Sequence, residues 1–423
     1  MRRLTFGVVL AMVLRNGVKS LPKAVSEALS WLGLGTASAS AYSQARYQLK
    51  HTAFVELNRR AVVETLYGDG EYRRFWGFRV LAVDGSKVAL PDTPGVRAAF
   101  GTIAYTGGKN GELRGERPWA LASVLYDVLN RVAVDAVLAR GDAYEVELAV
   151  GHLAHTQAGD LVLFDRNYPA YRMLGTCVRD GRHFVARCSA ASFAPARRML
   201  LGEGPDSQVA VLKPCAGQKA GIRGLGLPMA IKARFVRVRL PTGEFEVLVT
   251  SLLDAAKYPA AGFLELYGLR WGVETFYGVL KTRLGLENFS GTGPEAVRQD
   301  FHATVYLSGL ESILTADAQE KLDAKAVRHP QQVNRVVSFN ALKNNALDLL
   351  ASGLETGPLM QKLTVLFLQN PTLGACRTRL SGPEERRATI RPRRPDRILW
   401  RFKFVSPPRG GVIEPGWERL GAV

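Results

Sequence analysis

The sequence predicts an α/β protein in which a central sheet is flanked by helical regions, and the order of apolar patterns along the chain supports this. Apolar residues recur at helical spacing over residues 1–72, and strand-like runs alternate with helical stretches over 73–175. Residues 176–257 hold further strand-like runs, whereas 258–320 and 321–423 return to helical patterns and end in a basic tail. The 423 residues suffice for a sizeable core and for two or three domains.

The N-terminal region begins with an apolar run from Leu4 to Leu14 that follows two arginines, as the core of a signal peptide would. Arg15 and Lys19 come next instead of a small-residue cleavage site. The run is also shorter than the roughly 20 residues that cross a bilayer. We therefore expect a buried helix here and no membrane segment.

A second helix is expected to begin at Leu21, and the polar stretch Thr36–Ser40 offers hydroxyl groups that could cap a third. This third helix is basic, because it carries Arg46, Lys50, Arg59 and Arg60. A helix pair with a basic second helix could dock on DNA. The same charges could equally form a solvated face on a structural helix, and the sequence leaves both interpretations open.

Two aspartates follow short apolar strands in the 73–175 region. A strand-like run over residues 78–83 ends at Asp84, and the run Leu161–Phe164 is followed by Asp165. Acids at strand ends project from the edge of a sheet, where open α/β folds place their sites, although turns also favour Asp. Two further strands and a helix are expected at residues 119–129, 131–138 and 144–156.

The region 176–257 reads as an inserted module of strands. Its strand-like runs lie at residues 183–187, 208–212, 229–240 and 245–250. Thr242 and Gly243 mark a hairpin turn between the last two.

A long helix is expected over residues 260–285, and it carries four chemically distinct polar groups. These are Tyr267, Arg270, Glu274 and Lys281. At about 100° per residue their offsets fall within about 60° of each other, so the four side chains share one face. Apolar neighbours make the helix look partly buried, so a plain surface salt-bridge stripe is the weaker interpretation.

The charge balance points to a polyanionic partner. Lys and Arg number 56 against 38 Asp and Glu, a net charge of +18, and residues 377–423 alone carry 12 basic and 5 acidic side chains. The four cysteines include no CxxC pair, so we expect neither a zinc site nor a disulfide framework, and the chain fits a reducing cytoplasm.

The spacing Tyr-x2-Arg-x3-Glu-x6-Lys, from Tyr267 to Lys281, resembles the signature of the IS4-family insertion-sequence transposases, a group of DDE transposases. Asp84 within Val-Asp-Gly-Ser resembles the first aspartate of that family, and Asp165 within Phe-Asp-Arg-Asn-Tyr resembles the second. The fixed spacing makes the four-residue signature specific, whereas either aspartate alone would not be. The resemblance covers roughly residues 1–375.

This resemblance implies an RNase H-like catalytic core (73–175 and 258–320) that is interrupted by a β-strand insertion (176–257). A helical DNA-binding region (1–72) would precede it, and a helical region with a basic tail (321–423) would follow. Asp84, Asp165 and Glu274 would bind two Mg²⁺ or Mn²⁺ ions and act as the catalytic acids. Tyr267, Arg270 and Lys281 would hold DNA phosphates near the cleaved end.

The activity implied is cut-and-paste DNA transposition: strand cleavage at inverted-repeat ends, then strand transfer by the same two-metal site. The partners implied are double-stranded DNA, as terminal inverted repeats and target, and a second copy of the chain, because two DNA ends must meet. The expected location is the bacterial cytoplasm, associated with the nucleoid.

Two other functions are compatible with parts of the sequence. A catalytically inactive, transposase-derived DNA-binding protein or inhibitor fits the charge equally well, although intact acids argue against it. A glycosidase with paired acids leaves Arg270, Lys281 and the basic surplus without a role.

Overall fold

The computed structural model describes residues 4–15, 20–107, 112–240, 242–350 and 355–373. The basic tail at 377–423 lies outside the described residues. None of the helices within the described part is both long enough and apolar enough to cross a membrane.

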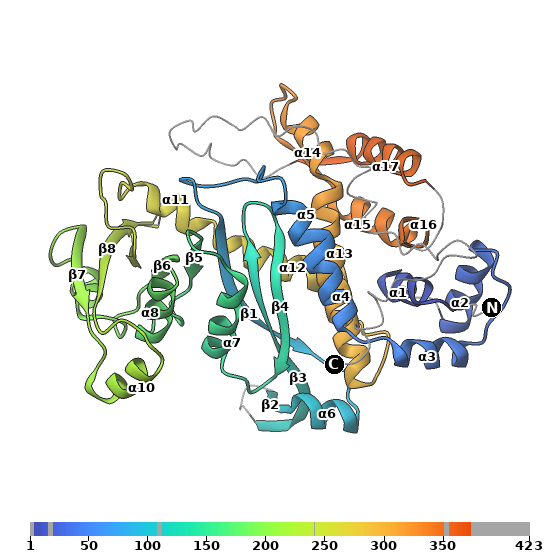
Figure 1. Cartoon of the computed structure of the whole chain (residues 1–423), viewed down its shortest axis with the longest axis horizontal. Helices are drawn as coiled ribbons and strands as arrows, with labels where there is room; N and C mark the ends of the chain where they lie inside the picture. Colours follow the sequence, from blue (N-terminus) through green and yellow to red (C-terminus); the bar gives the residue numbers. More distant parts are fainter. Residues whose placement is uncertain (1–3, 16–19, 108–111, 241, 351–354, 374–423) are drawn as a thin grey trace.

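A nine-stranded mixed sheet forms the centre of the molecule, with helices on both of its faces (Figure 1). The strand order is β2-β3-β1-β5-β6-β9-β8-β7, and β4 pairs with the remaining edge of β3. The pairs β1–β5 and β5–β6 are parallel, whereas the other pairs are antiparallel. The mixed α/β prediction is thus confirmed. The strands are β1 (Val80–Ala89), β2 (Thr102–Gly107), β3 (Glu112–Asp127), β4 (Val132–Arg140), β5 (Leu161–Phe164), β6 (His183–Arg187), β7 (Ser207–Leu212), β8 (Ile231–Arg239) and β9 (Phe245–Thr250).

Helices precede, interrupt and follow the sheet. The N-terminal ones are α1 (Phe6–Arg15), α2 (Leu21–Trp31), α3 (Ala39–Gln48), α4 (Thr52–Leu57), the π-helical turn η1 (Asn58–Val63) and α5 (Glu64–Tyr67). Those between strands are α6 (Pro94–Phe100), α7 (Glu145–His152) with the 3₁₀ turn η2 (Leu153–His155), α8 (Tyr171–Arg179), α9 (Ala194–Leu200), η3 (Ala216–Gln218) and α10 (Lys219–Gly224). After β9 come α11 (Gly262–Gly268), α12 (Trp271–Thr282), α13 (Pro294–Leu314), α14 (Ala316–Asp323), α15 (Arg335–Asn344), α16 (Ala346–Leu350) and α17 (Gly357–Gln369), with a two-stranded sheet of β10 (Gln331–Val333) and β11 (Pro371–Leu373).

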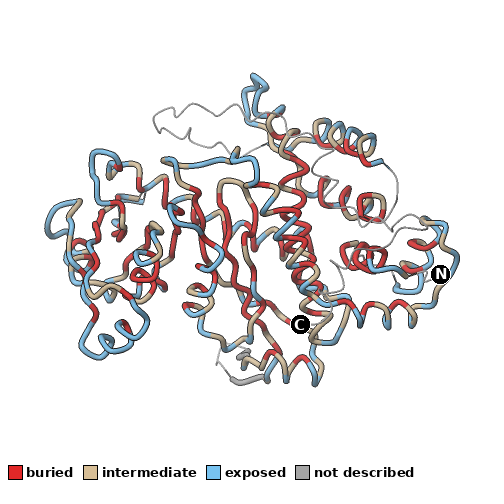
Figure 2. The backbone as a smooth tube through the Cα atoms, in the orientation of Figure 1, coloured by how far each residue is buried: buried red, intermediate tan, exposed pale blue. Residues whose placement is uncertain are grey.

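Alternate residues of β1 enter two separate cores, as the two-residue period of a strand requires. Val80 and Ala82 pack in the larger core with α12 and α13, while Leu81 and Val83 pack in a second core with α7 and α8. Buried residues concentrate along the central strands and α13 (Figure 2). The sheet is therefore a two-sided platform whose faces are covered by different helices.

The expectation that a strand ends at Asp84 is wrong, because β1 continues to Ala89. β1 stays paired with β3 as far as Ala89 opposite Trp119, but its last pair with β5 joins Ala82 to Leu163. Asp84 therefore lies inside a strand, at the point where that strand has just lost one of its two neighbours.

The strands of the 176–257 region continue the central sheet. β6 pairs with β5 in parallel, and β9 pairs with β6 in the antiparallel direction, with β8 and β7 beyond it. The same region also holds α9 and α10.

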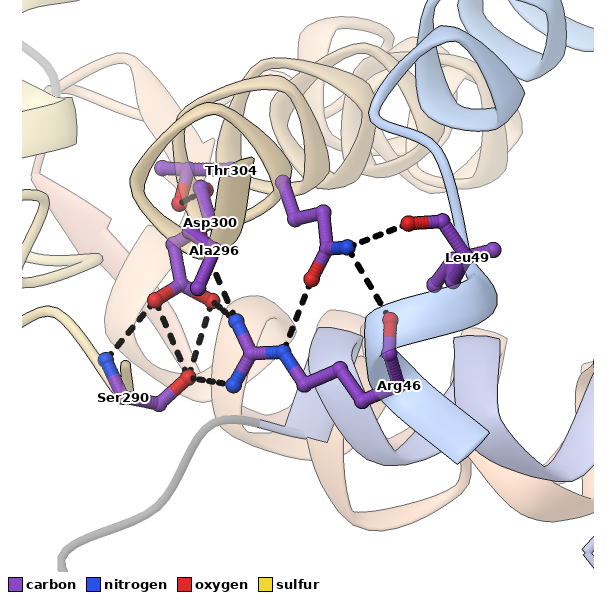
Figure 3. Close-up of polar contacts among 7 residues, drawn as sticks. Arg46, Leu49, Ser290, Ala296, Asp300 and Thr304 are labelled. Carbon is purple, nitrogen blue, oxygen red and sulfur yellow. Dashed lines mark hydrogen bonds and ion pairs between the residues drawn. The ribbon is translucent and has the colours of Figure 1, made fainter. Parts of the chain in front are cut away.

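Arg46 of α3 is a structural residue rather than a surface cation (Figure 3). The helix begins at a Ser38 cap, whose Oγ accepts from the amide of Ala41 at 3.1 Å. The Arg46 guanidinium points away from solvent and donates to Gln299 Oε1 and Asp300 Oδ1 of α13, both at 2.8 Å, and to Ser290 Oγ at 2.7 Å. The sequence leaves open whether Arg46 contacts DNA or lies on a solvated face. The structure shows that Arg46 instead joins the N-terminal helices to α13.

Replacing Arg46 should destabilise the fold strongly. We expect Arg46→Met to lower the free energy of unfolding by about 3–5 kcal/mol, because Asp300 would stay buried without its cation. Arg59→Met is the matched control: Arg59 is exposed and pairs with Glu56, so its loss should cost less than about 1 kcal/mol. Urea unfolding measures both, and similar small losses would contradict this role of Arg46.

His302 of α13 makes the stability depend on pH. It is buried beside His51, with ring centroids 5.4 Å apart, and burial lowers its pKa from 6.5 to about 3. Between these values the unfolded chain binds the extra proton, so stability is complete above pH 6.5 and falls toward pH 3, by about 1.4 kcal/mol per pH unit from this group. Unfolding of His302→Gln followed from pH 6.5 to 4 should show a shallower slope than the natural chain; an unchanged slope would rule the effect out.

Candidate active site

Asp84 and Asp165 are brought together by the parallel pairing of β1 with β5. The register joins Val80 to Leu161 and Ala82 to Leu163, and continuing it by two residues places Asp84 level with Asp165. Asp84 is two residues after Ala82, and Asp165 is two residues after Leu163, and both of these apolar residues face α12. Because side chains alternate between the two faces of a strand, we place both aspartates on the face that α12 covers.

Each aspartate is oriented by a backbone amide next to it in the chain. Asp84 Oδ1 accepts from the amide of Gly85 at 2.9 Å, and Asp165 Oδ1 accepts from the amide of Asn167 at 2.7 Å. The second contact is a local Asx turn, which fixes the carboxylate without help from distant residues.

The environment of Asp84 disfavours its ionised form. Burial is the main reason that the pKa of Asp84 rises to about 7, and the neighbouring acids Asp165 and Glu145 raise it further, while the Gly85 amide and Arg270 oppose the rise. A cation near these carboxylates would relieve this penalty. The site is therefore arranged to favour positive charge.

The single helix expected over 260–285 is instead two helices, α11 and α12, so that prediction is wrong. Leu269 and Arg270 form the turn between them, where the amide of Arg270 donates to Tyr267 O at 3.0 Å and that of Val273 to Arg270 O at 3.1 Å. These i to i+3 bonds are tighter than those of an α-helix. Gly268 ends α11, and glycine has a low helix propensity.

The guanidinium of Arg270 lies between Glu274 and Asp84. Its Nη2 is 2.8 Å from Glu274 Oε1, and its Nη1 is 3.9 Å from Asp84 Oδ2. The side chain of Arg270 is 6% exposed, and that of Glu274 is 40% exposed. Glu274 is thus connected to Asp84 through a cation. Among the residues that the structure describes, no three His, Cys, Asp or Glu side chains are close enough together to hold a metal ion.

Tyr267 precedes this ion pair along the chain, and Lys281 follows it. The Tyr267 hydroxyl and the Arg270 Nε are both buried and have no hydrogen-bond partner within the described part of the chain. Burial raises the pKa of Tyr267, so its hydroxyl stays protonated as a donor. Lys281 lies further along α12, where its Nζ donates to Lys87 O of β1 at 2.6 Å.

Two residues of this region, Tyr277 and Glu145, were not predicted from the sequence. The Tyr277 hydroxyl donates to Ala122 O at 2.9 Å and to Asp84 O at 3.1 Å, which fixes α12 across β1 and β3. Glu145 of α7 accepts a hydrogen bond from the Tyr168 hydroxyl at 2.7 Å, on the other face of the sheet. The one sequence signal for Tyr277 is its position three residues after Glu274, which puts the two side chains on neighbouring parts of one helix.

Removing the Tyr277 hydroxyl should loosen α12 from the sheet. We expect Tyr277→Phe to lower the free energy of unfolding by about 1–3 kcal/mol, because the single hydroxyl proton that the carbonyl oxygens of Ala122 and Asp84 share is lost. Tyr47→Phe serves as the control, since Tyr47 is 79% exposed and should tolerate the change. Chemical denaturation of both variants tests this, and equal stabilities would contradict it.

Comparison with known proteins identifies a family and a relative that are both described as transposases. Residues 75–307 match the family described as "Transposase DDE domain". The Escherichia coli (strain K12) protein "Transposase InsG for insertion sequence element IS4" is 27% identical over 269 residues, which cover 62% of this chain and 57% of that protein. The chain thus matches little more than half the length of this relative.

A solved structure, "Cryo-EM structure of piggyBac transposase synaptic complex with hairpin DNA", aligns with a TM-score of 0.44 and 11% identity, over 84% of this chain and 71% of that one. The family match covers more than half of the sequence and includes Asp84, Asp165 and the whole span from Tyr267 to Lys281. The chain therefore belongs to the DDE transposases, and to the IS4 family among them.

Proposed function

We propose that the chain is an active transposase that cuts DNA strands at inverted-repeat ends and joins them to a target by metal-dependent phosphoryl transfer. The observation that carries this proposal is the parallel pairing of β1 with β5, which sets the segments of Asp84 and Asp165 side by side, together with the Arg270 guanidinium that lies near both Asp84 and Glu274.

The order of the central strands supports an RNase H-like core. β4, β3 and β1 pair in the antiparallel direction, and β1, β5 and β6 follow in parallel. This arrangement sets the two aspartate-bearing segments side by side in the middle of the sheet. The C-terminal part of the core, α12, then brings Glu274 to the same face.

The donor set fits a hard divalent cation. Asp84 and Asp165 offer carboxylate oxygens, which Mg²⁺ and Mn²⁺ prefer, and a nearby cation would favour the ionised form of Asp84, whose pKa is raised mainly by burial. Asp84, Asp165 and Glu274 would hold two such ions once Glu274 leaves Arg270 and turns toward the two aspartates. Bound there, the ions would supply activation of the attacking oxygen and stabilisation of the leaving one.

Arg270 has two roles in this proposal. Without DNA it neutralises Glu274 and Asp84, and its Nε, together with the Tyr267 hydroxyl, remains a donor in need of an acceptor. A DNA phosphate supplies acceptor oxygens and would satisfy both groups. Lys281, further along α12, would contact the backbone as a point charge.

The charge of +18 favours double-stranded DNA as the partner, both as terminal inverted repeats and as target. Pairing two ends requires two active sites, so we propose a homodimer on DNA. The expected location is the bacterial cytoplasm, where the nucleoid supplies the substrate.

The proposed role of the three acids in DNA cleavage can be tested on a supercoiled plasmid that carries the coding sequence with its natural flanking DNA. We expect Mn²⁺-dependent nicking at the borders of the element by the natural chain. Asp84→Asn, Asp165→Asn and Glu274→Gln should each reduce it by more than about a thousandfold, because each removes a ligand that stabilises the transition state.

Asp142→Asn is the matched control, because Asp142 is an exposed acid that pairs with Arg140 outside the site, and it should nick at the natural rate. Gel separation of nicked and supercoiled plasmid gives the rate, and DNA binding is measured in parallel. Tight border binding with no metal-dependent nicking by the natural chain would instead favour an inactive DNA-binding protein.

A further inference from the structure

We infer that Glu145 is a positioning residue for the proposed cleavage reaction: its hydrogen bond with Tyr168 holds the turn that carries Asp165 against β1 beside Asp84. This inference rests on the proposed function, because it assigns a task within the same site. Glu145 is not part of the family signature quoted above, and it reaches the site from the opposite face of the sheet.

The first contact is between α7 and β1. Glu145 is the first residue of α7, and its carboxylate lies against the backbone of Gly85, the residue after Asp84. A β-carbon at position 85 would overlap that carboxylate, so the absence of a side chain at Gly85 is what allows the approach. Glu145 thus touches the strand at the point where Asp84 is oriented by the Gly85 amide.

The second contact is between α7 and the turn after β5. Tyr168 is fully buried, and its hydroxyl donates to Glu145 Oε1 at 2.7 Å. The Tyr168 amide donates to Asp165 O at 3.3 Å, and the Asn167 amide donates to Asp165 Oδ1 at 2.7 Å. Anchoring Tyr168 therefore fixes the three-residue turn that orients the Asp165 carboxylate.

The other end of α7 is fixed independently. His152 is buried, with Nδ1 2.6 Å from Asp135 Oδ2 of β4 and Nε2 2.9 Å from Ser123 Oγ of β3. Because α7 is held to two strands at its C-terminal end, Glu145 cannot follow the Asp165 turn if that turn moves. Helix α7 therefore holds the Asp165 turn at a fixed position relative to the sheet.

The hydrogen bond, rather than the negative charge, is the feature that does the positioning. Glu145 acts as the acceptor for Tyr168, and the amide oxygen of glutamine can accept the same bond. A group that bound the metal ion would instead need the carboxylate. The two possibilities therefore differ in what Glu145→Gln does.

Single-turnover nicking with Mn²⁺ tests the inference. We expect Glu145→Ala and Tyr168→Phe to slow nicking by about 10- to 100-fold, with unchanged DNA affinity, because a displaced Asp165 harms the reaction and not binding. Glu145→Gln should stay within about threefold of the natural rate. The double variant should be no slower than either single variant, since both remove one bond.

Hydrogen exchange of the peptide that covers Asp165–Tyr168 provides a readout without activity. Exchange of this peptide should be faster in Glu145→Ala and Tyr168→Phe than in the natural chain, and Glu145→Gln should exchange at the rate of the natural chain. Glu147→Ala, on the exposed face of the same helix, is the control and should change neither rate. Tyr168→Phe keeps the buried ring, so this variant is expected to fold.

Two results would overturn the inference. If Glu145→Gln nicks as slowly as Glu145→Ala, the charge of Glu145 acts directly. If Glu145→Ala and Tyr168→Phe nick and exchange like the natural chain, the hydrogen bond positions nothing. Absence of nicking by the natural chain, with the expected exchange pattern, would count against the proposed function and leave the anchoring of the turn intact.

Discussion

A carboxylate that is removed from water is unfavourable in its ionised form, and the region around Asp84 is organised by that cost. The pKa of Asp84 rises to about 7 because the side chain is buried and because Asp165 and Glu145 lie near it. The guanidinium of Arg270 offsets part of the penalty by lying between Asp84 and Glu274. In the proposed function, a divalent cation beside Asp84 would favour the ionised carboxylate and offset the rest of this cost.

The sheet supplies the geometry that keeps these charges close. β1 and β5 are far apart in the sequence, and the intervening β2, β3, β4 and α7 fold back so that the two strands become neighbours. α12 crosses on one face and is fixed by Tyr277, while α7 supports the other face through Glu145. The two helices therefore lie on opposite faces of the strands that carry the aspartates.

Much of this site could be predicted from the sequence, because its signals are local. The two aspartates follow apolar strand-like runs, and the spacing from Tyr267 to Lys281 is fixed along one segment. The extent of β1 could not be predicted, since it depends on pairing with β3. The break between α11 and α12 arises from a tight turn at Arg270, which the apolar period does not reveal.

Charge alone did not reveal the role of Arg46 in the N-terminal helices, which the sequence left open between a DNA contact and a solvated face. Arg46 reads as a candidate DNA contact, but its partners Gln299 and Asp300 are more than 200 positions away and only the fold brings them together. Glu145 and Tyr277 were missed for the same reason, because each is recognised by a tertiary contact and not by a neighbour in the chain. Local patterns therefore identify the candidate site residues more readily than the residues that hold them in place.

Anomalous diffraction from Mn²⁺ in crystals of the chain bound to a border duplex tests the central claim most directly. Manganese should bind to the carboxylates of Asp84 and Asp165, with Glu274 released from Arg270 and turned to the ions. Manganese bound elsewhere, or Glu274 still paired with Arg270 while the aspartates stay free of metal, would contradict the assignment of these acids as the catalytic centre.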